Sequence, residues 1–137
     1  MHHLSKIRLL TLTKTVSGAD IIYNKLKQYN VKHVFGYSGG CNLPLLNSFY
    51  KSVDPMFHAT CTEQGAGMMA TGFAKQSNSL GVAITTSGPG MTNIVTPLYD
   101  ANTDHVPLMV LSGQVATTSL GTRAFQEVSA IDIAKSV

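Results

Sequence analysis

Apolar and polar positions along this chain form short blocks that predict strands and helices in alternation. Apolar runs rich in β-branched and aromatic residues predict strands within residues 31–37, 56–60, 80–86 and 106–112. Stretches with helical spacing lie before and between them, at residues 18–30, 43–50, 64–77 and from the turn at Ser87-Gly88-Pro89-Gly90 to about Asp100. This alternation predicts an α/β fold, a doubly wound parallel sheet with helices on both faces.

The first predicted helix carries a capping residue and an apolar stripe. Ser17 can cap its first turn, because a serine hydroxyl accepts a hydrogen bond from a free backbone amide there. The stripe places Lys25 and Lys27 on the outside, and its members are Ile21, Ile22, Leu26 and Tyr29.

Composition limits the kinds of partner. Of the 137 residues, 44% are hydrophobic and only 12% are charged, so much of the surface is predicted to be interface. The net charge of +3 comes from Lys6, Arg8 and Lys14, which precede the first acid, Asp20, and the remaining charges balance. We therefore expect no nucleic-acid-binding face. No apolar run approaches the roughly 18 residues that a membrane helix needs.

The N-terminal segment and the cysteines bear on domain organisation and location. Residues 17–137 are predicted to form one domain, after a disordered leader at residues 1–16. The leader is basic and free of acids, so a transit-peptide remnant is the alternative, and it would change the expected location from the cytoplasm to a mitochondrion or plastid. Cys41 and Cys61 lack the spacing of zinc ligands and suit a reducing compartment, with a disulfide as the alternative.

Glu63 is the first candidate for chemistry. It lies where the strand at residues 56–60 gives way to the helix beginning at Gln64, and open α/β sheets bind ligands at the carboxyl ends of their strands. A structural role is the alternative, because acids are common in first helical turns and Thr60 with Glu63 has the spacing of a capping box.

The turn at Ser87-Gly88-Pro89-Gly90 is a candidate anion site. It follows a predicted strand and opens a helix, so its backbone amides could meet a phosphate. It lacks the third glycine of a dinucleotide-binding loop and the lysine of a P-loop. A tight strand-to-helix turn that requires glycine is therefore the alternative.

Five motifs, taken in order, carry a resemblance to one family. They are Phe35-Gly36-Tyr37-Ser38-Gly39-Gly40, Glu63-Gln64-Gly65-Ala66, Thr86-Ser87-Gly88-Pro89-Gly90-Met91-Thr92-Asn93, Ser112-Gly113-Gln114-Val115 and Gly121-Thr122-Arg123-Ala124-Phe125-Gln126-Glu127. Together they resemble the N-terminal pyrimidine-binding domain of thiamine-diphosphate enzymes, most closely acetolactate synthase. The resemblance covers residues 17–137.

The resemblance implies that Glu63 is catalytic and binds the cofactor. In this family the matching glutamate hydrogen-bonds N1′ of the aminopyrimidine and promotes the tautomer that deprotonates thiazolium C2. The activated cofactor then attacks pyruvate, releases carbon dioxide and adds the remaining fragment to a second 2-oxo acid. A positioned acid–base group contributes roughly 10²- to 10⁴-fold to a rate.

Four further residues receive roles from the same resemblance. Gln126 matches a catalytic glutamine that faces the reacting centre. Tyr37 matches a residue at the active-site entrance, and Pro89 and Asn93 match the turn that packs near the pyrimidine. The residues alone also allow scaffold roles: a strand-end aromatic for Tyr37, a helix cap for Asn93 and a surface polar group for Gln126.

The chain departs from the family pattern at several positions around the site. Serine replaces proline at Ser38, threonine replaces histidine at Thr62, and threonine replaces an acid at Thr71. Arginine replaces aspartate at Arg123, and alanine replaces proline at Ala116. Glu63 itself is retained, so these changes bear on rate and substrate choice more than on the class of cofactor.

The resemblance also implies a missing half. In this family a separate C-terminal domain holds the diphosphate and its magnesium, and the cofactor bridges two subunits. We therefore expect this chain to bind only the pyrimidine end of thiamine diphosphate, and to be a truncated or split synthase that is inactive alone. Its expected partners are a diphosphate-binding domain or full-length subunit in a homo- or hetero-oligomer, and a 2-oxo acid substrate. FAD is a further cofactor that the full-length family can carry.

Two other functions stay open on the sequence. The chain could be a non-catalytic docking or regulatory module that kept the fold, in which case Glu63 would be dispensable. It could also be a generic nucleotide-binding α/β domain, in which case it would bind a dinucleotide without thiamine diphosphate.

Overall fold

The computed structural model describes residues 15–50 and 52–137, so the predicted leader lies almost entirely outside the described residues. Four parallel strands form one sheet in the order β2-β1-β3-β4. They are β1 (His33–Gly36), β2 (Met56–Ala59), β3 (Gly81–Thr85) and β4 (Leu108–Ser112). Each lies within a predicted strand range, and the prediction of a parallel sheet is confirmed.

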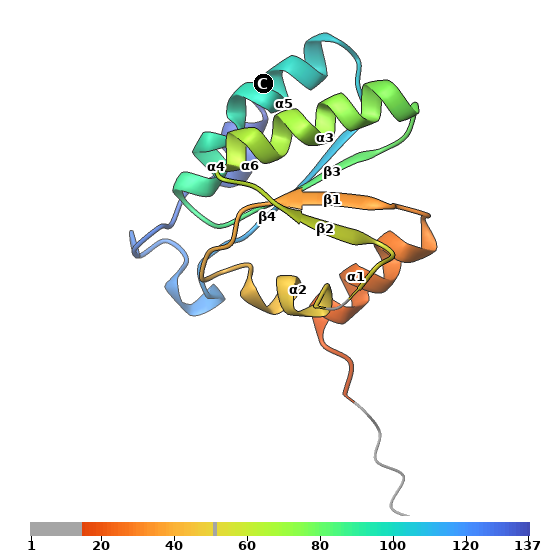
Figure 1. Cartoon of the computed structure of the whole chain (residues 1–137). Coiled ribbons are helices and arrows are strands. Elements are labelled where there is room, and N and C mark those ends of the chain that lie inside the picture. Colours follow the sequence, from red (N-terminus) through yellow and green to blue (C-terminus); the bar gives the residue numbers. More distant parts are fainter. Residues whose placement is uncertain (1–14, 51) are drawn as a thin grey trace, which may run out of the picture.

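Helices cover both faces of the sheet, as predicted. The helices are α1 (Gly18–Gln28), α2 (Leu43–Ser48), α3 (Glu63–Ser77), α4 (Pro89–Asn93), α5 (Val95–Thr103) and α6 (Ala130–Ala134), with a 3₁₀ turn η1 (Thr117–Ser119). Figure 1 shows α1 and α2 on one face, and α3, α4 and α5 on the other. The sheet is therefore the middle of three layers.

The single helix predicted after the glycine-rich turn is wrong, because the chain forms α4 and α5 there. They meet at Ile94, which is fully buried in the core. Pro97 explains the break: it has no N–H to donate to the carbonyl of Asn93, and its ring would clash with that carbonyl in a continuous helix. Asn93 consequently ends a short helix of its own.

Two apolar clusters fill the spaces between the layers. Residues of β1 and β3 alternate between them: Val34 and Ile84 lie on the α1–α2 side, and Phe35 and Ala83 lie on the α3 side. The α3 side is packed closely. A Cβ built on Gly81 would lie 2.3 Å from the carbonyl oxygen of Ala70. Helix α3 is thus fixed against the sheet, and with it the position of its first residue.

Helix α1 confirms the predicted cap and contradicts part of the predicted stripe. The Ser17 hydroxyl accepts from the amide of Asp20, whose carboxylate completes a capping box. Leu26 is buried, but Ile21, Ile22 and Tyr29 are exposed. The inward face instead includes Tyr23, whose ring meets the edge of the Phe49 ring at 5.2 Å between centroids.

The topology creates a switch point at the carboxyl ends of β1 and β3. These strands are neighbours, yet the chain leaves β1 toward α2 on one face and leaves β3 toward α4 on the other. The two connections therefore diverge, which is the arrangement that creates ligand sites in open α/β sheets. Helix α3 begins at this same end of the sheet.

Candidate functional site

Glu63 is the first residue of α3, and it takes no part in capping that helix. The cap is Thr62, whose hydroxyl accepts from the amide of Gly65 at 3.0 Å. The alternative capping box between Thr60 and Glu63 is wrong, since the Thr60 hydroxyl donates to the carbonyls of Gly36 and Thr62. The Glu63 carboxylate is therefore free for another role.

The Glu63 side chain is buried with a single hydrogen-bond partner. Only 6% of the residue is exposed, and Oε2 accepts from Nδ2 of Asn93 at 3.1 Å. The other oxygen, Oε1, has no hydrogen bond from any of the described residues. A carboxylate offers about four acceptor positions, so most of its capacity is unused. A buried acid with unused acceptors is a site where a ligand can donate a hydrogen bond.

No cation offsets this buried acid within the structure. The ion pairs among the described residues involve Asp54, Asp100, Asp104 and Asp132, and none involves Glu63. In residues 15–50 and 52–137, no group of three or more His, Cys, Asp or Glu side chains could hold a metal ion. The Glu63 side chain lies at the N-terminal, positive end of the α3 dipole and accepts a hydrogen bond from the amide group of Asn93.

The glycine-rich turn packs closely beside Glu63. A Cβ on Gly90 would lie 3.4 Å from Oε1 of Glu63 and 2.9 Å from Cγ2 of Thr86. Pro89, exposed at the start of α4, precedes this glycine. The turn thus brings Asn93 and Gly90 to the acid and presents Pro89 at the surface beside them.

The same turn is a poor anion site. The amides of Met91 and Thr92 both donate to the carbonyl of Gly88, at 3.0 and 3.2 Å, and the amide of Gly90 donates to Ser87 at 3.2 Å. Pro89 has no amide hydrogen. The donors that a phosphate would need are therefore used within the turn, and α4 is only five residues long.

The loop after β1 lies on the other side of the switch point from the glycine-rich turn. Tyr37 is 43% exposed at its start. Asn42, only 3% exposed, holds the loop closed: its Nδ2 donates to the carbonyl of Tyr37 at 2.9 Å and its Oδ1 accepts from the amide of Gly39 at 2.9 Å. A Cβ on Gly39 would lie 2.4 Å from Oγ1 of Thr86, so this loop rests directly on the end of β3.

Hydroxyl and thiol groups lie beneath that loop. Oγ1 of Thr85 and Oγ1 of Thr86 are buried and have no hydrogen-bond partner among the described residues. Ser87, also fully buried, lies 3.0 Å from Sγ of Cys41 through its Oγ. Cys41 and Cys61 are both free thiols, so the alternative of a disulfide between them is wrong.

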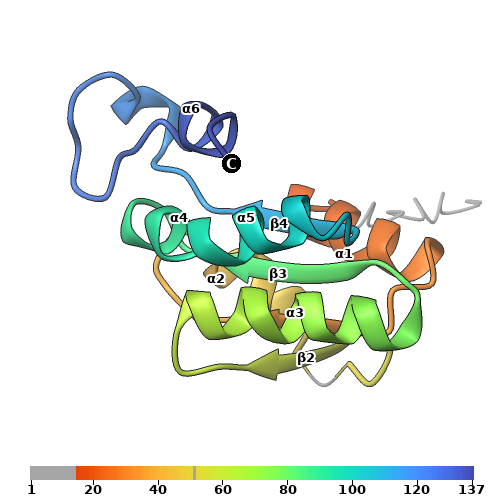
Figure 2. The ribbon, with the colours of Figure 1, turned by 90° about the horizontal axis from the view of Figure 1, so that it is seen from above.

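Gln126 lies against the glycine-rich turn, on a long loop after β4. The loop is closed at its base by Gln114, whose Nε2 donates to the carbonyl of Val128 at 2.8 Å. Figure 2 shows this segment beyond the end of the sheet toward which β3 points. A Cβ on Gly88 would lie 2.7 Å from Cα of Gln126, so the backbone of Gln126 lies against the glycine-rich turn.

Glu127 organises the tip of that loop. Its Oε1 accepts a short hydrogen bond from the amide of Gly121, and its Oε2 accepts from the amide of Ala124 at 3.0 Å. The hydrogen bond from Gly121, followed by those from the other loop amides, holds the pKa of Glu127 below its usual value, although partial desolvation opposes the shift. The negative charge therefore stabilises this loop conformation.

The structure places the five predicted site residues at one end of the sheet, but they differ in how closely they approach Glu63. Glu63 and Asn93 are hydrogen-bonded, and Pro89 and Gln126 adjoin the Gly88 turn. Tyr37 lies on the facing loop without a described contact to Glu63.

Two residues that shape the site, Asn42 and Glu127, were not predicted from the sequence. Asn42 had a visible signal, an asparagine between a glycine turn and a Leu-Pro helix start. Glu127 had none beyond its place in the last motif, because its partners are backbone amides.

Several departures from the family pattern have structural consequences. Thr62 caps α3, and the buried hydroxyl of Thr71 donates to the carbonyl of Gly67 at 2.9 Å. Arg123 adopts φ 60°, a conformation that suits aspartate better than arginine. Ser38 is exposed in the loop after β1, and Ala116 is exposed just before η1.

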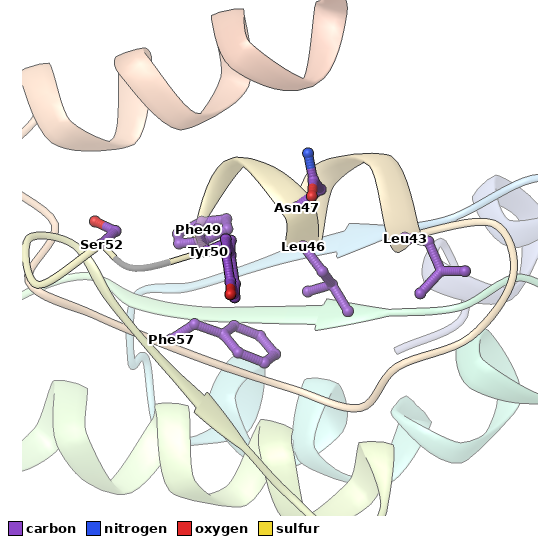
Figure 3. A pocket seen from close by; sticks show the side chains of 7 residues that line it. All are labelled: Leu43, Leu46, Asn47, Phe49, Tyr50, Ser52 and Phe57. Carbon is purple, nitrogen blue, oxygen red and sulfur yellow. The ribbon is translucent and has the colours of Figure 1, made fainter.

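A separate apolar groove of about 600 Å³ lies between α2 and β2, and none of the described residues that line it is an acid or a base (Figure 3). It is lined by Leu43, Leu46, Asn47, Phe49, Tyr50, Ser52 and Phe57. None of the predicted site residues lines this groove. In the part of the chain that the structure describes, no helix is both long and apolar enough to cross a membrane.

Comparison with known proteins agrees with the geometry. A family model described as the thiamine pyrophosphate enzyme N-terminal TPP binding domain matches residues 16–134. The chain is 46% identical over 119 residues to the mitochondrial acetolactate synthase catalytic subunit of Aspergillus candidus, covering 87% of this chain and 17% of that protein.

Two bacterial relatives have similar identity and also match over only a small part of their length. The acetolactate synthase large subunit of Corynebacterium glutamicum is 46% identical over 112 residues, which cover 82% of this chain and 18% of that protein. The isozyme 2 large subunit of Escherichia coli K12 is 40% identical over 119 residues, which cover 86% and 21%. The chain spans about a fifth of the length of these relatives. It belongs to the thiamine pyrophosphate enzymes, whose N-terminal cofactor-binding domain it contains, and thiamine diphosphate is the cofactor that this family implies.

Proposed function

We propose that this domain supplies the aminopyrimidine-binding half of a thiamine-diphosphate site in an acetolactate synthase-like enzyme, with Glu63 as the acid–base group. The supporting observation is the Glu63 carboxylate, which is buried, held by Asn93 through Oε2, and unoccupied at Oε1. A buried acid of this kind would be costly in a domain that used it for nothing.

The residues around Glu63 fit an aromatic heterocycle. Oε1 can accept a hydrogen bond from a protonated ring nitrogen and can return a proton to it. The amide of Asn93 fixes the plane and position of the carboxylate. Gly90 lets the turn approach Oε1 closely, because an added Cβ would lie 3.4 Å from this oxygen. Bound thiamine diphosphate would supply the carbon nucleophile for decarboxylation and carboligation of 2-oxo acids.

The remaining site residues take supporting roles in this proposal. Pro89 contacts the pyrimidine end of the cofactor, and Tyr37 lines the entrance from the facing loop. Gln126 faces the reacting centre from the loop after β4. The positions of these residues at one end of the sheet support the assignment.

The other half of the site is expected on a diphosphate-binding domain, on a longer form of this chain or on another polypeptide. That domain would hold the diphosphate and magnesium, since the described residues offer no metal cluster. The assembly would be a homo- or hetero-oligomer, inactive without that domain, and any FAD would bind to its other domains. The exposed Phe125 (89%), beside Gln126, is consistent with a surface that another domain covers.

The test is Glu63→Gln in an enzyme that joins this domain to a diphosphate-binding domain. Glutamine keeps the size and one acceptor but cannot exchange a proton. We expect formation of acetolactate from pyruvate to fall about 10²- to 10⁴-fold. The matched control is Asp104→Asn, which removes an exposed carboxylate paired with Lys75.

Two outcomes would replace the proposal. Full activity of Glu63→Gln would favour a docking or regulatory module, in which the acid is dispensable. Binding of a dinucleotide with no affinity for thiamine diphosphate would favour a generic nucleotide-binding domain, against which the internally used amides of the Gly88 turn already argue.

We propose a cytoplasmic location, with a mitochondrion or plastid as the alternative. Relatives from Aspergillus candidus and Saccharomyces cerevisiae carry the word mitochondrial in their names, and one from Zea mays is named chloroplastic. Microscopy of the protein with a fluorescent C-terminal fusion would separate these locations.

A further inference from the structure

The loop from Gln114 to Val128 is held in shape at two levels. At its base, Gln114 bridges its own segment and Val128: Nε2 donates to the Val128 carbonyl and Oε1 accepts from the amide of Val115 at 2.9 Å. At its tip, the Glu127 carboxylate accepts from the amides of Gly121 and Ala124. The base fixes where the loop leaves the fold, and the tip fixes its internal conformation.

That internal conformation is one the chain does not adopt readily. Arg123 has φ 60° and Gln126 has φ 62°, both in the left-handed region that disfavours residues with a side chain. Such conformations persist only where surrounding contacts impose them. Arg123 lies between Gly121 and Ala124, whose amides Glu127 binds, and Gln126 immediately precedes Glu127.

The strained residue Gln126 is also the one that contacts the candidate site. Its Cα and carbonyl oxygen would lie 2.7 and 2.8 Å from a Cβ on Gly88, so only a glycine permits this approach. Gly88 itself has φ 57° and immediately precedes Pro89. The position of Gln126 beside the site therefore depends on the loop conformation and on Gly88 together.

We propose that Glu127 is a positioning residue: its carboxylate, by binding the loop amides, holds Gln126 against the Gly88 turn, which leads into the helix that carries Asn93 to Glu63. The consequence for catalysis rests on the function proposed above, whereas the consequence for the position of Gln126 does not. Glu127 acts through Gln126 and need not touch substrate or cofactor.

A carboxylate is required for this task because both of its oxygens accept. Glutamine would present an NH₂ group to one of the two amides and lose that hydrogen bond. Hydrogen bonds to a charged acceptor are also stronger than those to a neutral amide oxygen. No salt bridge involves Glu127 among the described residues, so its charge is used for the loop amides.

The first experiment measures position directly on this chain by NMR. In Glu127→Gln and Glu127→Ala we expect amide exchange at Gly121 and Ala124 to accelerate about tenfold or more, and the proton contact between Gln126 and Gly88 to be lost. Amides of β3 should keep their exchange rates, which shows that the fold is intact. The matched control is Asp132→Asn, an exposed carboxylate on α6 that should change neither readout.

The second experiment is a double-mutant cycle in the enzyme with its diphosphate-binding domain. If Glu127 acts through Gln126, Glu127→Ala should lower kcat for acetolactate formation in the parent and have no further effect in a Gln126→Ala background. The KM for pyruvate should change less than kcat. Glu127→Asp, which keeps a carboxylate, should recover part of the loss.

The outcomes separate this proposal from the proposed function. An unchanged Gln126–Gly88 contact in Glu127→Ala overturns the proposal, as do additive effects in the cycle. If the parent enzyme forms no acetolactate at all, the proposed function fails, and the NMR contact alone still decides whether Glu127 positions Gln126.

Discussion

The two glutamates of this chain occupy opposite environments. Glu63 is buried at the start of α3 with one hydrogen bond, from the side chain of Asn93. Glu127 is partly exposed in a loop, and it accepts from backbone amides through both oxygens. Neither forms a salt bridge among the described residues.

The difference shows how the partners of an acid reveal its use. The acceptors of Glu127 are taken by the chain itself, so its charge stabilises local structure. Oε1 of Glu63 has no hydrogen bond from any of the described residues, so this oxygen is available as an acceptor to a ligand. Burial alone would not distinguish these roles, because structural acids are also buried when they are well paired.

The largest effect is expected from Asn93→Asp, which changes the environment of Glu63. It replaces the one donor to Glu63 with a second carboxylate 3.1 Å away. Asn93 is itself exposed, but the buried Glu63 would lose its one described donor and gain a neighbour of like charge. We expect the free energy of unfolding at pH 7 to fall by about 2–3 kcal/mol. Urea denaturation measures it. Asn47→Ala, at an exposed asparagine, should stay within about 0.5 kcal/mol, and an equal loss there would show that the Asn93 effect is not specific.

Adding a side chain at Gly90, next to Oε1 of Glu63, is the next test. Gly90→Ala places a methyl group 2.9 Å from Cγ2 of Thr86 and 3.4 Å from Oε1, and we expect a destabilisation of about 1–3 kcal/mol. Gly72→Ala is the matched control. Gly72 lies inside α3 with no atom within 4 Å of an added Cβ, so alanine should stabilise by about 0.5–1 kcal/mol. Thermal unfolding of both variants should give opposite signs, and equal signs would contradict the packing argument.

Acidification sharpens the Glu127 side of the comparison. The pKa of Glu127 is lower in the folded chain than in the unfolded one, because the amide of Gly121 binds the charged form. The stabilisation is complete above the usual glutamate pKa of about 4.3. It disappears as the pH falls through the lowered folded value. Exchange at the Gly121 amide should therefore accelerate in this window, beyond its intrinsic pH dependence, and Glu127→Gln should remove the effect.

The smallest expected effect concerns the histidine pair on β1 and β2. Nδ1 of His33 lies 2.8 Å from Nε2 of His58, and burial, followed by the charge of His33, lowers the pKa of His58. Below pH 6.5 the unfolded chain takes up a proton that the folded chain resists, so stability should decline slightly as the pH falls. Melting temperatures at about pH 7.5 and about pH 5.5, on either side of the usual histidine pKa, measure it. His58→Gln should flatten the dependence, and His105→Gln, at an exposed histidine, should not.

The sequence predicted what depends on local pattern. The four strands and the position of Glu63 follow from apolar runs and from a single acid at a strand–helix junction. The break at Ile94 could also have been predicted, because Pro97 is visible in the sequence. The spacing of Thr60 and Glu63 fits a capping box, but the backbone entering α3 makes Thr62 the cap instead.

The loop after β4 could not be predicted from pattern. Its closure joins Glu127 to backbone amides of Gly121 and Ala124, and every residue but proline offers such an amide. Side-chain chemistry therefore does not indicate which backbone amides the Glu127 carboxylate will bind. Tyr23 was not predicted on the inward face of α1 for a related reason. Its ring packs against Phe49, which is distant in the sequence.

The closure of the loop after β1 by its own Asn42 bears on how the site tolerates substitution. This side of the switch point is held by hydrogen bonds of Asn42 with Tyr37 and Gly39, whereas the opposite side is held by Asn93 and the glycine-rich turn. The two sides share contacts at Thr86 but no hydrogen bonds through its side chain among the described residues. A substitution on the Tyr37 side, such as one at the exposed Ser38, can therefore alter that side without breaking the hydrogen bond between Glu63 and Asn93.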